Sequence, residues 1–138
     1  MSFYGTTIND SPTVAGVASA TIEGKAFHAA AFDSDGKIIV NATKGANVLG
    51  LLGAEHGDVE AGGTVTVQIK DIGLWKAGAA ITAGAELTSD ANGCAVTATA
   101  GDFITAIALE PAAAADEIIK VQIVKAGYAK TEIGRAHV

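Results

Sequence analysis

Alternating apolar and polar residues mark a series of short strands along the chain. The clearest is "TVTVQIK" (64–70), where Val and Ile occupy every second position, as in a strand with one buried face. Other apolar segments end at clusters of Gly, Asp, Asn or Ser, which favour turns. They are "KAFHAAAF" (25–32), "KIIVNAT" (37–43), "NVLGLLG" (47–53), "IGLWKAG" (72–78), "AELTSD" (85–90), "CAVTATA" (94–100), "DFITAIALE" (102–110) and "IIKVQIV" (118–124). This spacing predicts a single all-β domain, a small barrel or sandwich, with strands covering Lys25–Val124.

One segment predicts a helix. "PAAAADE" (111–117) begins with Pro, which is well placed in a first helical turn. We therefore expect one short helix near Pro111–Asp116, of one or two turns at most.

Two stretches of the chain repeat the same order of features. Each has a Ser-Asp turn with Gly, a strand, a second Gly, an apolar strand and then Val-Gln-Ile, in 34–69 and again in 89–124. The offset is 55 residues at the Ser-Asp pair, 56 at the second Gly and 54 at Val-Gln-Ile. The pattern predicts an internal duplication whose two copies close on each other into one small barrel. Chance agreement in a chain rich in Gly, Ala and Val is the alternative.

The two ends of the chain lack this pattern. Residues 1–14 are polar and rich in turn residues, and their isolated apolar residues are Phe3, Tyr4 and Ile8. We expect an extended arm there, because a purely solvated tail has little reason to carry two aromatic residues. The predicted organisation is an N-terminal arm (1–14), a β-barrel-like body (15–128) and a polar tail (129–138).

Composition narrows the kinds of partner. Hydrophobic residues make up 49% of the chain but aromatic residues only 5%, so the core must consist mainly of Ala, Val, Ile and Leu. The net charge of −6 argues against nucleic acid as a partner, because affinity for nucleic acid comes from Lys and Arg on phosphates. No apolar run reaches the roughly 18 residues of a membrane span, and the first residues lack the pattern of a signal peptide. The lone Cys94 excludes an internal disulfide and is typical of assembly in a reducing cytoplasm.

Few residues offer chemistry. His28 lies within a predicted strand, where a histidine usually packs or faces solvent, and His56 lies in the acidic loop 53–60, which lacks the H-E-x-x-H spacing of a zinc site. The turn "DSDGK" (33–37) resembles the start of a calcium loop but lacks its later ligands. Cys94 follows a turn Gly and is expected to be a small filler. The sequence therefore predicts no enzyme, no metal site and no cofactor.

Four segments carry a resemblance to a known family. They are "DSDGKIIVNATKGANVLGLLG" (33–53), "AGAAITAG" (77–84), "TSDANGCAVTATAG" (88–101) and "AIALEPAAAA" (106–115). Together, over about residues 25–128, they resemble the capsid decoration, or cement, proteins of tailed phages, with "AIALE" where that family has "GIALE".

The resemblance implies a β-rich, barrel-like virion protein, usually trimeric, on the outer surface of the capsid. Such a protein binds the major capsid protein and braces the shell against the pressure of packaged DNA, after assembly in the host cytoplasm. It implies no catalytic residues.

Two sets of residues are expected to make contacts. Phe3, Tyr4 and Ile8 of the arm are expected to dock on the capsid as an extended segment. Trp75 is the candidate anchor of a trimer interface, since aromatic residues dominate interface hot spots. The alternative for Trp75 is a plain core residue.

Three other functions stay open at this point. One is another virion part, such as a tail-tube or fibre subunit. A β-barrel module that binds a small ligand or a sugar is the second, and it would need an aromatic-lined pocket. The third is a hydrolase or lyase built around His56.

The last residues lead to a prediction of a different kind. One reading frame of a short DNA adapter common in sequencing libraries encodes "EIGRAHV" (132–138). We expect this segment to be an artefact of sequence assembly, so that Arg135 and His137 carry no function. Mass spectrometry of the native protein should find no peptide that ends in these residues, and such a peptide would establish a genuine polar tail instead.

Overall fold

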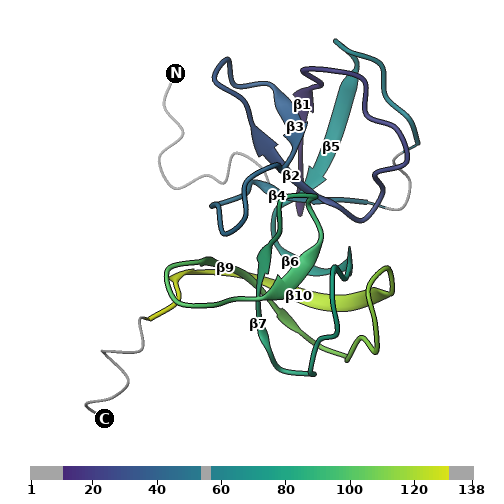
Figure 1. The fold of residues 1–138 in the computed structure, drawn as a ribbon. Coiled ribbons are helices and arrows are strands. Elements are labelled where there is room, and N and C mark those ends of the chain that lie inside the picture. Colours follow the sequence, from purple (N-terminus) through teal and green to yellow (C-terminus); the bar gives the residue numbers. More distant parts are fainter. Residues whose placement is uncertain (1–10, 54–56, 131–138) are drawn as a thin grey trace.

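The chain folds into two antiparallel sheets. The computed structural model describes residues 11–53 and 57–130, and within these ranges it contains strands, turns and no helix, which confirms the all-β prediction. Figure 1 shows two lobes, with β6 leaving their junction into the second lobe. The strands are β1 (Thr13–Val17), β2 (Ala29–Phe32), β3 (Ile38–Val40), β4 (Gly50–Leu52), β5 (Thr64–Gln68), β6 (Asp71–Lys76), β7 (Glu86–Ser89), β8 (Ala95–Thr97), β9 (Phe103–Ala108) and β10 (Ile118–Tyr128). No helix in the described ranges is long and apolar enough to cross a membrane.

The two sheets have the same topology. The first has the order β1-β5-β4-β2-β3 and the second β6-β10-β9-β7-β8, so adding five to each strand number converts one into the other. The registers also agree, because Thr13 pairs with Gln68 in the first sheet as Ile72 pairs with Gln122 in the second. The internal duplication is therefore present in the fold. We call residues 13–68 the first repeat and residues 72–128 the second repeat.

The expectation of one barrel shared by both copies is wrong, because each copy curls on itself. In the first repeat, a parallel bridge joins Ala18, just after β1, to Ile38 at the start of β3. In the second repeat, Ala77 and Ala95 form the same bridge. The two edge strands of each sheet thus meet within their own repeat, which protects those edges without help from the other copy.

The predicted alignment of the two turns is shifted by two residues. Asp33 caps the first turn, since its Oδ1 accepts the N–H of Asp35 at 2.8 Å and of Lys37 at 2.9 Å. Asp90 caps the second turn, where its Oδ1 accepts the N–H groups of Asn92 and Cys94, both at 2.9 Å. The equivalent residues are therefore Asp33 and Asp90, because the function of the Asp side chain in the turn determines the correspondence.

The short helix expected near Pro111–Asp116 does not form. Ala112 instead makes an antiparallel bridge with Ile81, with N···O distances of 2.9 and 3.0 Å in the two directions. Asp116 has a φ of 76°, outside the helical region, and its N–H bonds the carbonyl of Ala77 at 2.8 Å. One helical turn has little stability of its own, so these hydrogen bonds to the rest of the second repeat determine the conformation.

The strands extend beyond the predicted range at both ends. β1 lies before Lys25 and includes Thr13 and Val14, which the sequence placed in the arm. β10 continues past Val124 to Tyr128 through an irregularity between Ile123 and Gly127.

The apolar core forms two clusters. The first repeat has its own cluster, made of Ala18, Ile22, Ala30, Ile38, Leu52, Val65 and Val67. The larger cluster contains Trp75 and the interior of the second repeat, together with Ala29, Val48 and Leu51 of the first repeat. The first repeat thus supplies part of the second repeat's core.

Hydrogen bonds join the two repeats along a contact that we call the seam. In the seam, turn 90–93 and Trp75 of the second repeat lie against β2 of the first. The carbonyl of Gly93 accepts two bonds, from the Ala29 N–H at 2.7 Å and from Trp75 Nε1 at 3.0 Å. Gly45 adds two more, donating to the Ser89 carbonyl at 2.9 Å and accepting from the Phe103 N–H at 3.0 Å.

Side chains close the margins of the seam. Asn41 is buried, and its Nδ2 donates to Ser89 Oγ at 2.8 Å. Lys44 Nζ lies 2.7 Å from Asp102 Oδ2, and Lys125 Nζ donates to the Leu49 carbonyl at 2.6 Å.

The two turn glycines provide a direct test of the seam. Gly36 and Gly93 have φ values of 77° and 79°, so a substitution by Ala strains the backbone equally, by about 1–2 kcal/mol. A Cβ on Gly36 would meet nothing within 4 Å, whereas one on Gly93 would lie 2.9 Å from Val40 Cγ1 and 3.2 Å from the Ala29 carbonyl oxygen. We expect Gly93→Ala to lower the free energy of unfolding by roughly 1–3 kcal/mol more than Gly36→Ala, as measured by urea denaturation. Equal losses would show that the seam is not tightly packed.

Candidate functional site

Among the described residues, the candidates for chemistry that the sequence suggested have structural surroundings. His28 is buried, with 5% of its surface exposed, and its Nδ1 lies 3.0 Å from the Ala26 carbonyl oxygen, which satisfies one ring nitrogen within the core. Across residues 11–53 and 57–130, no group of three or more His, Cys, Asp and Glu side chains could hold a metal ion. His56 and His137 lie outside the described residues.

Cys94 is placed as a filler in the core. It is buried beside the seam, and burial followed by the charge of Asp90 raises the pKa of its thiol. A reactive cysteine needs the opposite environment, one that stabilises the thiolate.

The turn that resembled a calcium loop uses its Asp for structure. Hydrogen bonds from the Ser19 hydroxyl and from the backbone N–H of Lys37 lower the pKa of Asp33 below its ordinary value. Since Asp33 Oδ1 already caps the turn, this carboxylate serves the hairpin between β2 and β3.

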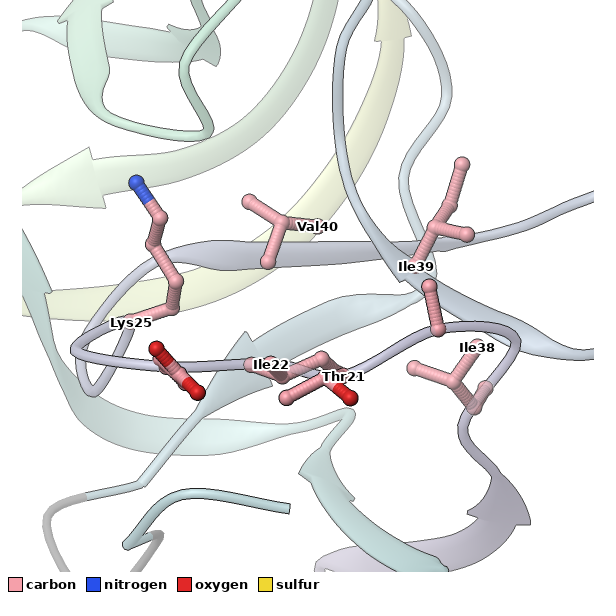
Figure 2. Close-up of a pocket in the computed structure, with 8 residues that line it drawn as sticks. Thr21, Ile22, Lys25, Ile38, Ile39 and Val40 are labelled. Carbon is pink, nitrogen blue, oxygen red and sulfur yellow. The ribbon is translucent and has the colours of Figure 1, made fainter. Parts of the chain in front are cut away.

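An open hollow of about 480 Å³ lies on the first repeat. Figure 2 shows Lys25 at one end of it and Ile38 at the other, with Ile22 and Val40 between them. Of the described residues that line it, Glu23 and Lys25 are the charged ones and none is aromatic. The hollow therefore lacks the aromatic platform that binding of a sugar would need.

The structure places Trp75 in the core. None of its surface is exposed, and its indole N–H bonds the Gly93 carbonyl. Trp75 therefore has no surface to offer a neighbouring copy, in line with the alternative considered from the sequence. Phe3, Tyr4 and Ile8 of the predicted arm lie outside the described residues.

The second repeat carries an exposed apolar face. Ile72 and Leu74 of β6 and Ile118 of β10 have 58%, 40% and 39% of their surface exposed. They lie on one side of the sheet, because Lys76, two residues after Leu74, pairs with Ile118. We call these three residues the apolar face.

The equivalent face of the first repeat is different in character. In the aligned registers, Ile72, Leu74 and Ile118 correspond to Thr13, Ala15 and Thr64. The shared fold therefore does not require large apolar residues at these positions, and the apolar face is a candidate contact surface. The sequence held a signal for it, since "IGLW" places apolar residues on both faces of one strand.

Asp102, at the margin of the seam, has a carboxyl group whose pKa is changed by its neighbours. Burial alone would raise the pKa of this carboxyl, but hydrogen bonds from Lys44 Nζ and from the N–H and hydroxyl of Thr99 outweigh that effect and lower the pKa below the ordinary 3.8. A carboxyl whose pKa is lowered by folding stabilises the protein above its unfolded pKa. This stabilisation is lost as the pH falls through the folded pKa.

We therefore expect Asp102→Asn to lower the free energy of unfolding at pH 7 by about 1–3 kcal/mol. The difference from the wild type should stay constant at neutral pH. It should begin to shrink below about pH 4, where the carboxyl of the unfolded chain takes up a proton, and disappear once the pH falls below the lowered pKa of the folded state. Chemical denaturation across this pH range measures it. Asp116→Asn is the control, because Asp116 is 81% exposed and its contact with Lys76 is 3.7 Å long, so its effect should stay within about 0.5 kcal/mol. A difference that persists unchanged at pH 2 would contradict this account.

Comparison with known proteins finds one phage protein family and a solved phage structure of similar fold. A family model described as phage cement protein matches residues 34–123, which are 90 of the 138 residues. No curated protein matches the chain. Among solved structures, the N base of head fiber gp8.5 in bacteriophage phi29 is similar, with a TM-score of 0.63 and 19% identity, covering 85% of this chain and 97% of that chain. At this identity the similarity supports the fold alone.

Proposed function

The chain belongs to the phage cement protein family, and from this premise we propose that it binds the outer surface of a phage capsid and stabilises the shell. The family match over residues 34–123 is the observation that carries the proposal. The partner we propose is the major capsid protein, and the site of action is the outside of the virion.

The architecture supports a role in bracing. The two repeats share a core and a hydrogen-bonded seam, as a bracing protein would need. Its net charge of −6 disfavours binding to the packaged genome or to host nucleic acid. The family match names a cement protein, and we propose no reaction for the chain.

The direct test adds the purified chain to undecorated capsids of the phage that encodes it. We expect saturable occupancy of the outer surface, seen by electron microscopy, and a higher temperature for release of DNA from filled heads. Capsids that remain bare at micromolar protein would contradict the proposal.

We propose further that the arm makes the capsid contact. An extended segment can add a strand to the edge of a neighbouring sheet, while alternate side chains such as Phe3 and Tyr4 fill pockets. Ordering such a segment costs roughly 1–2 kcal/mol per residue, so one arm alone binds weakly. Several arms on one oligomer act together and can raise avidity about 10²–10⁴-fold. We also propose that the oligomer is a homotrimer, as is usual in this family.

Deleting residues 2–10 tests the arm. We expect capsid occupancy to fall at least tenfold, because the docking segment is lost, while the circular dichroism spectrum and the melting temperature of the body stay unchanged. A variant that carries Phe3→Ala, Tyr4→Ala and Ile8→Ala in an arm of full length separates side-chain contacts from chain length. Undiminished occupancy would assign the contact to the body, where the apolar face is the first candidate.

A second function is favoured by a specific observation. The similarity to the N base of a head fiber covers 97% of that chain, so a base that attaches a fibre to the head is an alternative to a compact cement protein. Electron microscopy of decorated heads distinguishes the two, since a base carries further density beyond the described body.

A further inference from the structure

The two repeats use their equivalent turns differently. Turn 90–93 of the second repeat is part of the seam, where a Cβ on Gly93 would collide with the first repeat. Its equivalent, turn 33–36 of the first repeat, is exposed, and a Cβ on Gly36 would meet nothing within 4 Å. The molecule therefore carries this turn, which we call the knob, twice. The copy at 90–93 packs against the other repeat, and the copy at 33–36 is exposed.

The surface that receives the knob also exists twice. In the first repeat it consists of Ala29, Val40 and Asn41, and the equivalent positions of the second repeat are Glu86, Thr97 and Ala98. The backbone there is the same, because the Asn41 N–H bonds the Ala29 carbonyl at 2.9 Å as the Ala98 N–H bonds the Glu86 carbonyl at 2.8 Å. In the second repeat, however, Glu86 and Thr97 are exposed.

A hollow marks this second receiving surface. It has a volume of about 860 Å³ and is lined by Glu86, Ala98, Ala100, Ile104 and Tyr128 among others. Tyr128 is 64% exposed and stands edge-on to Phe103 with ring centroids 5.3 Å apart. The hollow thus offers small side chains beside an aromatic ring for an inserted apolar group, with Glu86, Thr99 and Lys130 as polar groups around them.

The exposed knob has chemistry that matches the hollow. Phe32, which directly precedes the turn, is 56% exposed, whereas the corresponding Ser89 is buried in the seam. Asp35 in the turn is opposite in charge to Lys130, which lies at the hollow. Lys37 at the end of the turn can offset the charge of Glu86.

We propose that turn 33–36 and Phe32 of one copy dock into the 860 Å³ hollow on the second repeat of another copy, repeating between molecules the seam that joins the repeats within one. Such a contact is head-to-tail, because the two surfaces that meet are different. It closes into a ring or continues as an open chain, depending on the rotation between copies. This inference deepens the proposed self-association and rests on it, and it does not depend on capsid binding.

Two variants block opposite sides of this contact. Phe32→Glu disables the knob, and Ala98→Arg fills the hollow. We expect each to raise the dissociation constant for self-association at least about tenfold, as measured by analytical ultracentrifugation. An equimolar mixture of the two variants should form dimers and nothing larger, because one intact knob and one intact hollow remain. Recovery of the dimer also shows that both variants are folded. Leu109→Ser, which removes an exposed apolar side chain outside both the hollow and the apolar face, is the matched control and should associate like the wild type. Ile72→Ser tests the apolar face as the rival surface for self-association.

Several results would overturn the proposal. They include a wild-type chain that stays monomeric up to about 1 mM, unchanged association of both variants, or loss of association in Ile72→Ser alone. Stronger self-association after removal of residues 131–138 would also count against it, because the chain's own tail would then be the occupant of the hollow.

Decoration of capsids is measured separately. If Ala98→Arg abolishes decoration while association is unchanged, the hollow binds the capsid, and the proposal is wrong. If association behaves as expected but wild-type chains leave capsids bare, the proposed function fails and the head-to-tail contact stands.

Discussion

The double hydrogen bond to the Gly93 carbonyl is the interaction on which the rest of the structure depends. Its two donors, the Ala29 N–H and Trp75 Nε1, lie in fully buried residues, and a buried donor without a partner costs about 1–3 kcal/mol. Only a residue that tolerates a φ of 79° and has no Cβ can bring its carbonyl so close to β2. The position of this glycine therefore determines how Trp75 packs and where the second repeat sits against the first.

The seam explains why a duplicated chain forms one unit. Each repeat closes its own sheet through a parallel bridge, so the two could in principle be separate small domains, which are hard to stabilise at about 60 residues. The contribution of Leu51 and Val48 to the core around Trp75 removes that difficulty by making one larger apolar cluster.

Much of the fold could be predicted from local patterns, and the errors have identifiable causes. Alternation of apolar residues locates strands such as β5 because burial of one face leaves a period of two. It fails for β1, where Ala15 and Val17 are exposed and the strand is held by pairing with β5. The helix predicted from Pro111 failed because Ala112 bonds to Ile81, a partner thirty-one residues away that no local pattern reveals. Trp75 could be recognised as an anchor by its type, but only the packing shows that it anchors the inside of the protomer.

The candidate surfaces were the hardest features to predict, because each depends on comparing the two repeats in space. An exposed Phe32 in isolation is an ordinary surface residue. It acquires meaning only when its equivalent, Ser89, is found buried in the seam.

Duplication itself creates this situation. When one copy of a surface becomes internal to the chain, its twin remains with the same backbone geometry and without a partner among the described residues. Side chains at the free copy are then released from the constraint of the seam, as Phe32 in place of Ser89 shows. A chain of two repeats that forms the seam once inside the molecule thus carries the two surfaces of a second such contact on its outside. Two different complementary surfaces on one chain are what head-to-tail assembly needs.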